Sequence, residues 1–244
     1  ARVAVVGTSA MRDAGGGEAV RRHVQATLGV EARTISGDEE ARLTFGGALS
    51  GIARGSHDAA QPRRVRVFDI GGGSTEVVHG ELPADPRAAS AILFSRSYDV
   101  GSVRLTERHV RSDPPSADDL AAVRAAAASV FAPVPAFSAD VPPVGIAGTM
   151  TTLAAVALKL ERYDGARVHG WTMPVAELDR VVAELAAMPL SRRRSVLGME
   201  PKRADVIVAG GLIALGYLAH VGADAVTISD RGVRWGLAEE LASG

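Results

Sequence analysis

The stretch from Asp69 to Glu76, Asp-Ile-Gly-Gly-Gly-Ser-Thr-Glu, constrains this chain more than any other segment. An apolar run ending at Phe68 leads into it, and a second run starting at Val77 leaves it, which predicts two strands joined by a glycine turn. Three successive glycines permit positive φ angles and leave no Cβ in the way, so several N–H groups can converge on one anion. The pattern predicts a phosphate-holding hairpin, and the strands at both ends disfavour a flexible Gly/Ser tether.

The side chains of this hairpin extend the same chemistry. Hydroxyl donors follow the glycines, and the predicted phosphate contacts are Gly71, Gly72, Gly73, Ser74 and Thr75. Asp69 and Glu76 have the wrong charge to bind phosphate directly, but their oxygens suit a hydrated Mg²⁺ that bridges protein and phosphate. We therefore expect a Mg²⁺ site at these two acids; the alternative is a turn-forming aspartate and a surface glutamate.

Length, charge and composition limit the classes of protein to which this chain can belong. The 244 residues are enough for one large α/β unit or two lobes. Lys and Arg total 27 against 28 Asp and Glu, so no global positive field favours nucleic acid. The chain has no cysteine and no apolar run near the roughly 20 residues that span a bilayer. We expect a cytoplasmic protein without a membrane or nucleic-acid partner.

Strand and helix patterns alternate along the chain, which favours an α/β architecture. Strands are predicted at 3–7, 30–35, 91–98, 144–147 and 225–229, besides the two strands of the hairpin. Helices are predicted at 18–28, 39–49, 116–131, 150–160, 174–188, 190–197, 203–219 and 233–241, with a further one carrying Arg104 and Glu107. Gly148 and Thr149 open a helix after a strand, which suits anion or nucleotide contact through free N–H groups or, alternatively, tight packing.

Six ordered segments resemble the exopolyphosphatase and guanosine pentaphosphate phosphohydrolase family. They are GTSAMRDA at 7–14, ISGDEEARL at 35–43, DIGGGSTE at 69–76, GSVRLTE at 101–107, GIAGT at 145–149 with TLA at 152–154, and SDRGVRWGL at 229–237. The resemblance spans nearly the whole chain, whereas the glycine hairpin alone is shared with actin, sugar kinases and chaperone ATPases.

The resemblance implies a two-lobed fold of the actin-like ATPase (ribonuclease H-like) superfamily, in its short form. Residues 1–50 would form part of the first lobe, with the helix at 230–244 returning to it, and residues 64–229 would form the second. The family opens its first lobe with another hairpin, of the form Asp-Ile-Gly-Thr-Asn-Ser, and this sequence has no such segment. We therefore expect a first lobe that is incomplete at its N-terminus.

The resemblance also implies a reaction, the release of orthophosphate from the end of polyphosphate or from guanosine pentaphosphate with the help of Mg²⁺. Glu40 would orient and deprotonate the attacking water, although it could be a glutamate that complements the helix dipole, and Glu39 is its neighbour and competitor. Arg12 would bind phosphate as a fork or lie solvated in a turn. The run Arg192-Arg193-Arg194 could guide a polyanion, but such runs are more often solvated.

Two alternatives stay open at this stage. One is a phosphotransferase of the kinase type on the same fold, which would need an acceptor and an adenosine pocket. The other is a non-catalytic module that binds polyphosphate or an alarmone and acts through a partner. Family members often pair, so a homodimer is also expected.

Overall fold

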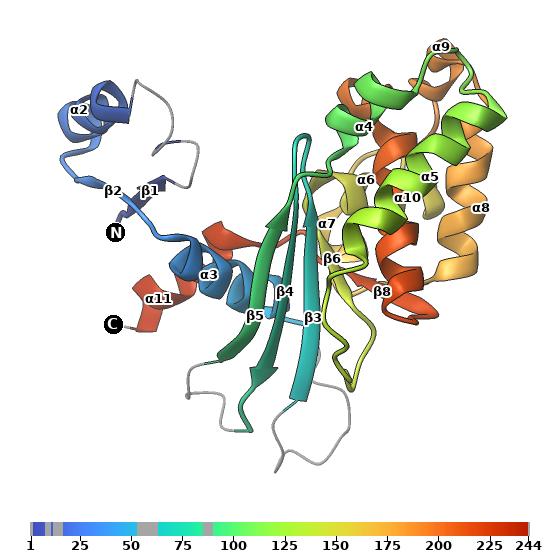
Figure 1. Cartoon of the computed structure of the whole chain (residues 1–244). Helices are drawn as coiled ribbons and strands as arrows, with labels where there is room; N and C mark the ends of the chain where they lie inside the picture. The colour runs from blue at the N-terminus through green and yellow to red at the C-terminus, as the bar shows by residue number, and fades with distance from the viewer. Residues whose placement is uncertain (1, 8–10, 12–16, 53–62, 85–89, 244) are drawn as a thin grey trace. The chain divides into compact units, whose positions relative to one another are not determined.

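A computed structural model describes residues 2–7, 11, 17–52, 63–84 and 90–243 of the chain. The chain forms two compact units (Figure 1). The first unit comprises Ala1–Ser50 with Arg231–Gly244, and the second comprises Gly51–Asp230. Within the described ranges no helix is both long and apolar enough to cross a bilayer.

In the first unit two short strands pair with each other, and two of the helices pack together. Strands β1 (Val5–Gly7) and β2 (Ala32–Thr34) run parallel, and α2 (Gly17–Leu28) lies between them in the chain. Helix α3 (Gly37–Leu49) packs on α11 (Val233–Ser243), the last helix of the chain.

Two glycines explain how closely α3 and α11 approach. A Cβ on Gly47 would lie 2.0 Å from the carbonyl oxygen of Gly232, and one on Gly236 would lie 2.1 Å from that of Leu43. Arg231 reinforces the same contact, because its guanidinium donates to the Ser50 carbonyl at 2.9 Å. The C-terminal helix is thereby joined to residues near the start of the chain.

The second unit is built on a six-stranded sheet in the order β5-β4-β3-β6-β8-β7. Its strands are β3 (Arg63–Ile70), β4 (Thr75–Leu82), β5 (Ala91–Tyr98), β6 (Val144–Ile146), β7 (Thr172–Pro174) and β8 (Ala225–Ile228). Strands β3, β4 and β5 form an antiparallel meander, β3, β6 and β8 are parallel, and β7 is an antiparallel edge. The hairpin predicted around the glycines is confirmed, with Ile70 opposite Thr75 in its register.

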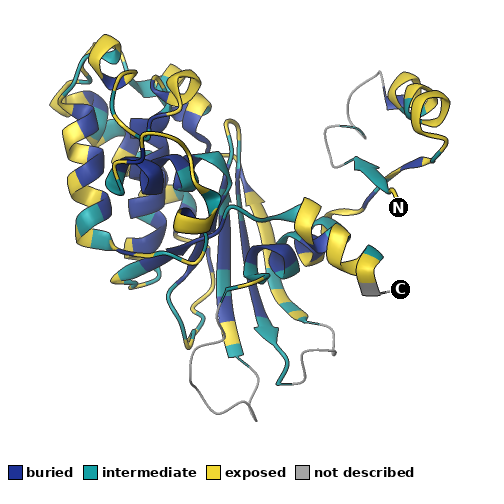
Figure 2. Ribbon diagram, turned by 180° about the vertical axis from the view of Figure 1, so that it is seen from behind, coloured by how far each residue is buried: buried dark blue, intermediate teal, exposed yellow. Residues whose placement is uncertain are grey.

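The helices of this unit share one apolar core with the sheet (Figures 1 and 2). They are α4 (Ser102–His109), α5 (Ala117–Phe131), α6 (Ala147–Ala157), α7 (Gly165–Val168), α8 (Val175–Ala186), α9 (Leu190–Arg193) and α10 (Ile207–His220), with a 3₁₀ turn at Pro201–Arg203. Helix α10 is apolar almost throughout and packs against α5 and α8. The centroid of its Tyr217 ring lies 4.8 Å from the ring centroid of Phe68 in the sheet and 5.4 Å from that of Phe131.

Local chemistry fixes the start of α5 where the sequence predicts it. The Ser116 hydroxyl accepts from the Asp119 amide at 3.1 Å, and the Asp119 carboxylate accepts from the Ser116 amide at 3.0 Å, a reciprocal capping box. Hydrogen bonds that the Asp119 carboxylate accepts from the Ser116 amide and the Ser112 hydroxyl lower the pKa of Asp119 to about 2.

Three expectations for the second unit need correction. Helix α6 begins at Ala147, directly after β6 and three residues earlier than expected. The predicted helix 190–197 shortens to α9, because Arg193 turns inward to donate to the carbonyls of Leu185, Met188 and Ala204. Strand β7 was not predicted, since three residues ending in proline carry no alternating pattern.

A buried histidine gives the unit a pH-dependent stability. His79 on β4 is fully buried, stacks on Phe137 at 4.7 Å between ring centroids and lies 3.4 Å from the Tyr217 hydroxyl. Burial, together with the charges of Arg66 and His220, lowers the pKa of His79 to about 4. The neutral ring is therefore the form that the fold accommodates.

We expect the free energy of unfolding to fall by roughly 3 kcal/mol through His79 alone as the pH drops from 6.5 to 4. In this window the unfolded chain binds a proton at His79 and the folded chain does not, so acid favours unfolding. Urea denaturation at pH 7 and pH 4.5, for the wild type and His79→Phe, measures the difference. Equal pH dependence in both proteins would contradict the assignment.

Candidate active site

The glycine loop joins β3 to β4 and is held by the start of α4. Its carbonyls face that helix: Gly71 accepts from the Ser102 amide at 2.9 Å, and Gly72 accepts from the amides of Val103 and Arg104 at 2.9 and 3.0 Å. Gly72 and Gly73 are exposed, and within the described residues their own amides donate to no backbone carbonyl. The Gly72 and Gly73 amides are therefore not used in backbone hydrogen bonds among the described residues, so they can donate to an anion.

The reason for the glycines differs from the sequence-based expectation. None of Gly71, Gly72 and Gly73 has a positive φ, so the left-handed conformation is not what they supply. A Cβ on any of these three glycines would meet no surrounding atom closer than 3.1 Å, so a lack of space does not require them either. The crowded position is Gly101, just before α4, where a Cβ would lie 2.4 Å from the Gly72 carbonyl oxygen and 2.6 Å from the Gly73 carbonyl carbon. Close approach between the loop and the helix start is therefore the structural requirement.

Asp69 and Glu76 are direct partners in the β3–β4 register, so their side chains project from the same face of the hairpin. Both residues are half-buried. The Glu76 Oε1 atom accepts from the hydroxyls of Ser74 and Ser97, each at 2.7 Å. Ser97 is the partner of Glu76 on β5, so one row across three strands carries two acids and a hydroxyl.

This row fits Mg²⁺, which takes one or two carboxylates and fills its other positions with water and phosphate oxygens. No group of three or more His, Cys, Asp or Glu side chains in the described ranges is spaced to hold a metal. A cation at Asp69 and Glu76 would therefore depend on oxygens brought by water and substrate.

The hydroxyl of Thr75, which the sequence assigned to phosphate binding, points into the protein, and so does the hydroxyl of Thr149, whose expected anion contact was through its amide. The Thr75 side chain is fully buried and donates to the Val100 carbonyl at 2.6 Å. The Thr149 side chain is also buried and donates to the Ile70 carbonyl at 3.0 Å, at the residue that precedes the glycine loop. Each of these hydroxyls stabilises one end of the glycine loop. Ser74 is therefore the remaining hydroxyl of the predicted phosphate contacts.

Gly148 lies at the start of α6 under an arginine. A Cβ there would lie 2.0 Å from Cζ of Arg203, so a side chain at this position would displace the exposed guanidinium. The preceding residue, Ala147, has a φ of 62°, a strained conformation for alanine. Gly148 and Arg203 also line a pocket of about 300 Å³ together with Thr152.

Glu40 and Glu39 lie in the first turn of α3, in the first unit. The Ser36 hydroxyl caps the helix by accepting from the Glu39 amide at 3.1 Å, and the Glu40 amide donates to the Ser36 carbonyl at 2.9 Å. The Glu39 carboxylate accepts from the Arg33 guanidinium, so this acid has a structural partner. Arg12 lies outside the described residues.

The structure brings together most of the candidate residues that belong to the second unit. Asp69, Glu76, Ser74 and the glycines form one end of the β3–β4 hairpin, and Thr149 braces that end. Glu40 belongs to the other compact unit. Sequence reasoning missed Gly101 and Ser97, whose roles depend on strands and helices paired across many residues; the GSVRLTE match was the only signal for Gly101.

The sheet combines an antiparallel meander with parallel strands, and a helix start packs on its glycine loop. This is the arrangement expected of the actin-like ATPase class of folds. The solved Ppx/GppA protein from Aquifex aeolicus superimposes with a TM-score of 0.83 at 29% identity, covering all of this chain and 76% of that one. The expected actin-like ATPase fold is thereby confirmed.

The family model described as the Ppx/GppA phosphatase family matches residues 1–243, and the chain belongs to this family. It is 37% identical to exopolyphosphatase 2 of Mycobacterium tuberculosis, over 99% of this chain and 75% of that protein. It is 27% identical to the guanosine-5'-triphosphate,3'-diphosphate pyrophosphatase of Vibrio atlanticus, over 98% of this chain and 44% of that protein. Both names are those of hydrolases, which confirms the expected class of enzyme.

Proposed function

We propose that this protein releases orthophosphate from the end of inorganic polyphosphate or from the 5' end of guanosine pentaphosphate. The observation that carries the proposal is the glycine loop: Gly72 and Gly73 are exposed, their amides donate to no described backbone carbonyl, and the loop joins the two strands that carry Asp69 and Glu76. Membership of a family whose relatives bear the names of both activities supports the same substrates.

In the proposed mechanism the glycine loop holds the terminal phosphate through the amides of Gly72 and Gly73. Cleavage of a phosphoanhydride requires an in-line water and neutralisation of charge on the transferred group, so positioning and electrostatics supply most of the catalysis. Glu40 would orient the water and accept its proton. Mg²⁺, when bound at Asp69 and Glu76, would neutralise phosphate charge.

The decisive experiment is phosphate release from long-chain polyphosphate and from guanosine pentaphosphate, each with Mg²⁺ and with EDTA. Release that needs Mg²⁺ supports the proposal. Tight polyphosphate binding without any release overturns it in favour of a binding module. Transfer of the phosphate to an added acceptor such as ADP, with no free orthophosphate, overturns it in favour of a kinase-type phosphotransferase.

Asp69→Asn is expected to lower phosphate release by about 100-fold and to move the Mg²⁺ titration midpoint to higher concentration, because one ligand charge is lost. Glu81→Gln is the matched control: it removes one negative charge from the same hairpin, but its partner is Arg64 at 2.9 Å. Calorimetric Mg²⁺ titration in the presence of a phosphate analogue gives a second readout. Equal metal affinity in Asp69→Asn and the wild type would contradict the metal assignment.

A further inference from the structure

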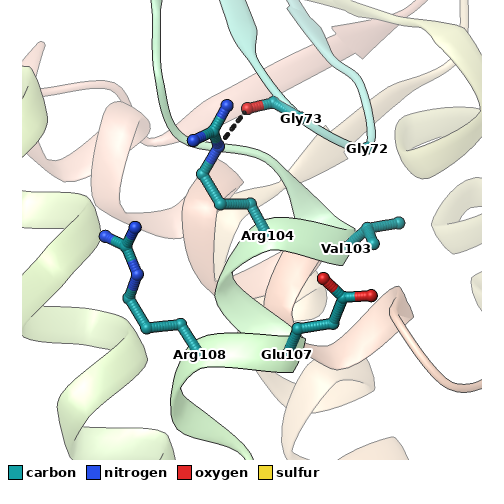
Figure 3. A pocket seen from close by; sticks show the side chains of 6 residues that line it. All are labelled: Gly72, Gly73, Val103, Arg104, Glu107 and Arg108. Atoms are coloured by element: carbon teal, nitrogen blue, oxygen red, sulfur yellow. Dashed lines mark hydrogen bonds between the residues drawn. The ribbon is translucent and has the colours of Figure 1, made fainter.

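Beside the glycine loop lies an open pocket of about 670 Å³, which two arginines line. It is lined by Gly72, Gly73, Val103, Arg104, Glu107 and Arg108 (Figure 3). The loop forms one wall and α4 forms the other. The pocket therefore continues from the residues that present the amide donors.

Arg104 and Arg108 are four residues apart on α4, and their side chains extend to the same side of the helix in Figure 3. Arg104 is fixed in place: its Nε donates to the Gly73 carbonyl at 2.8 Å, and its Nη2 lies 3.3 Å from an Asp99 carboxylate oxygen. Arg108 is exposed, and in the described part of the chain no acid forms an ion pair with its guanidinium. One guanidinium is thus held against the loop, and the next is available to a ligand.

The chemistry of the lining selects for phosphate. Planar guanidinium groups match phosphate oxygens as a fork, and two of them line the pocket beside one acid, Glu107. Asp99, which is not among the lining residues, pairs with Arg104, so Arg108 is the guanidinium with no acid partner among the described residues. No aromatic side chain is among the six lining residues, so the pocket offers no ring on which a nucleobase could stack.

We propose that Arg104 and Arg108 form an outer phosphate subsite, which binds the phosphate groups of an inorganic polyphosphate that follow the group held at the glycine loop. The inference rests on the proposed function and names its preferred substrate. A long polyphosphate reaches the subsite with further phosphates, whereas guanosine pentaphosphate presents a nucleoside after its short 5' chain. The subsite therefore favours polyphosphate.

Arg108→Gln tests the subsite without disturbing the loop, because Arg108 makes no side-chain bond to it. We expect KM for long-chain polyphosphate to rise about fivefold, a modest change because the site is solvated and salt-screened. We expect kcat to stay the same and KM for guanosine pentaphosphate to stay within about twofold. Added salt should shrink the difference between Arg108→Gln and the wild type.

Arg192→Gln is the matched control, since it removes one exposed arginine of the same unit, from α9, that does not line the pocket. An equal rise in KM for Arg108→Gln and Arg192→Gln would reveal a diffuse positive field and overturn the subsite. Unchanged KM in Arg108→Gln, in a protein that does release phosphate, overturns the subsite and leaves the proposed function standing.

A binding measurement separates the two proposals when there is no turnover. Fluorescently labelled long-chain polyphosphate is titrated in EDTA with the wild type and Arg108→Gln. If neither protein releases phosphate but Arg108→Gln binds about fivefold more weakly, the hydrolase proposal fails and the subsite holds. Equal binding by both proteins overturns the subsite.

Discussion

Glu40→Gln is expected to slow phosphate release by about 10²- to 10⁴-fold, the usual contribution of a positioned general base. The substitution keeps the size of the side chain and removes the carboxylate that would accept the proton of water. We expect the loss in kcat with little change in KM, because the proposed role of Glu40 lies in the transition state and not in holding the substrate. Steady-state phosphate release at saturating Mg²⁺ measures both constants.

Glu39→Gln is the control for this variant. Both glutamates lie in the first turn of α3, so each substitution removes a similar helix-dipole interaction of about 0.3–1 kcal/mol. Glu39→Gln also weakens the ion pair with Arg33, an exposed contact worth at most about 1 kcal/mol. Near-normal release by Glu39→Gln beside inactive Glu40→Gln would identify the base. The reverse result would assign the role to Glu39.

Local sequence chemistry predicted the parts of the fold that depend on neighbouring residues. The alternation around the glycines predicted β3 and β4, and β5 was predicted with the bounds that the structure has, 91–98. The helix predicted to begin at residue 116 is α5, and Ser116 caps it through an amide only three residues away. In these cases the partner of each group is fixed by the spacing along the chain.

The remainder depended on contacts between distant residues. The Thr75 hydroxyl looks like a phosphate donor in the sequence, but it donates to a backbone carbonyl 25 residues away. The Thr149 hydroxyl, for which the sequence predicted no role, donates to a backbone carbonyl 79 residues away. Arg193 sits in an exposed-looking run of three arginines, yet it is buried because three carbonyls converge on its guanidinium. Residue type predicted the chemistry available near the glycine loop, whereas tertiary packing determined which hydroxyls face a ligand.

The glycines are another case in which contacts between distant residues decide where glycine is needed. Sequence reasoning attributed them to positive φ, which is the commonest need for glycine in a turn. In the structure none of the three has a positive φ. The position where only glycine fits is Gly101, which lies 28 residues beyond Gly73 and outside the turn. Its conformation, φ −147° and ψ 162°, is one that any residue adopts, so backbone strain plays no part. Only the packing of the loop carbonyls on its Cα excludes a side chain.

Gly101→Ala is therefore expected to have a large effect from a single methyl group. The added Cβ would lie 2.4 Å from the Gly72 carbonyl oxygen, so the loop and the start of α4 must separate, and the bonds from Ser102 and Val103 to the loop must lengthen. Overpacking of this kind lowers the free energy of unfolding by about 1–3 kcal/mol. A shift of the amides by about 1 Å would reduce phosphate release by about 100-fold.

Gly46→Ala adds the same methyl group where no atom lies within 4 Å of the built Cβ, in the middle of α3. There alanine should stabilise the protein by about 0.5–1 kcal/mol, because glycine is the weaker helix former. Urea denaturation and phosphate release, measured on both variants, compare strain at the loop with the effect of a methyl group alone. Full activity and unchanged stability in Gly101→Ala would show that the loop tolerates displacement from α4, and would remove the argument that this packing positions the phosphate-binding amides.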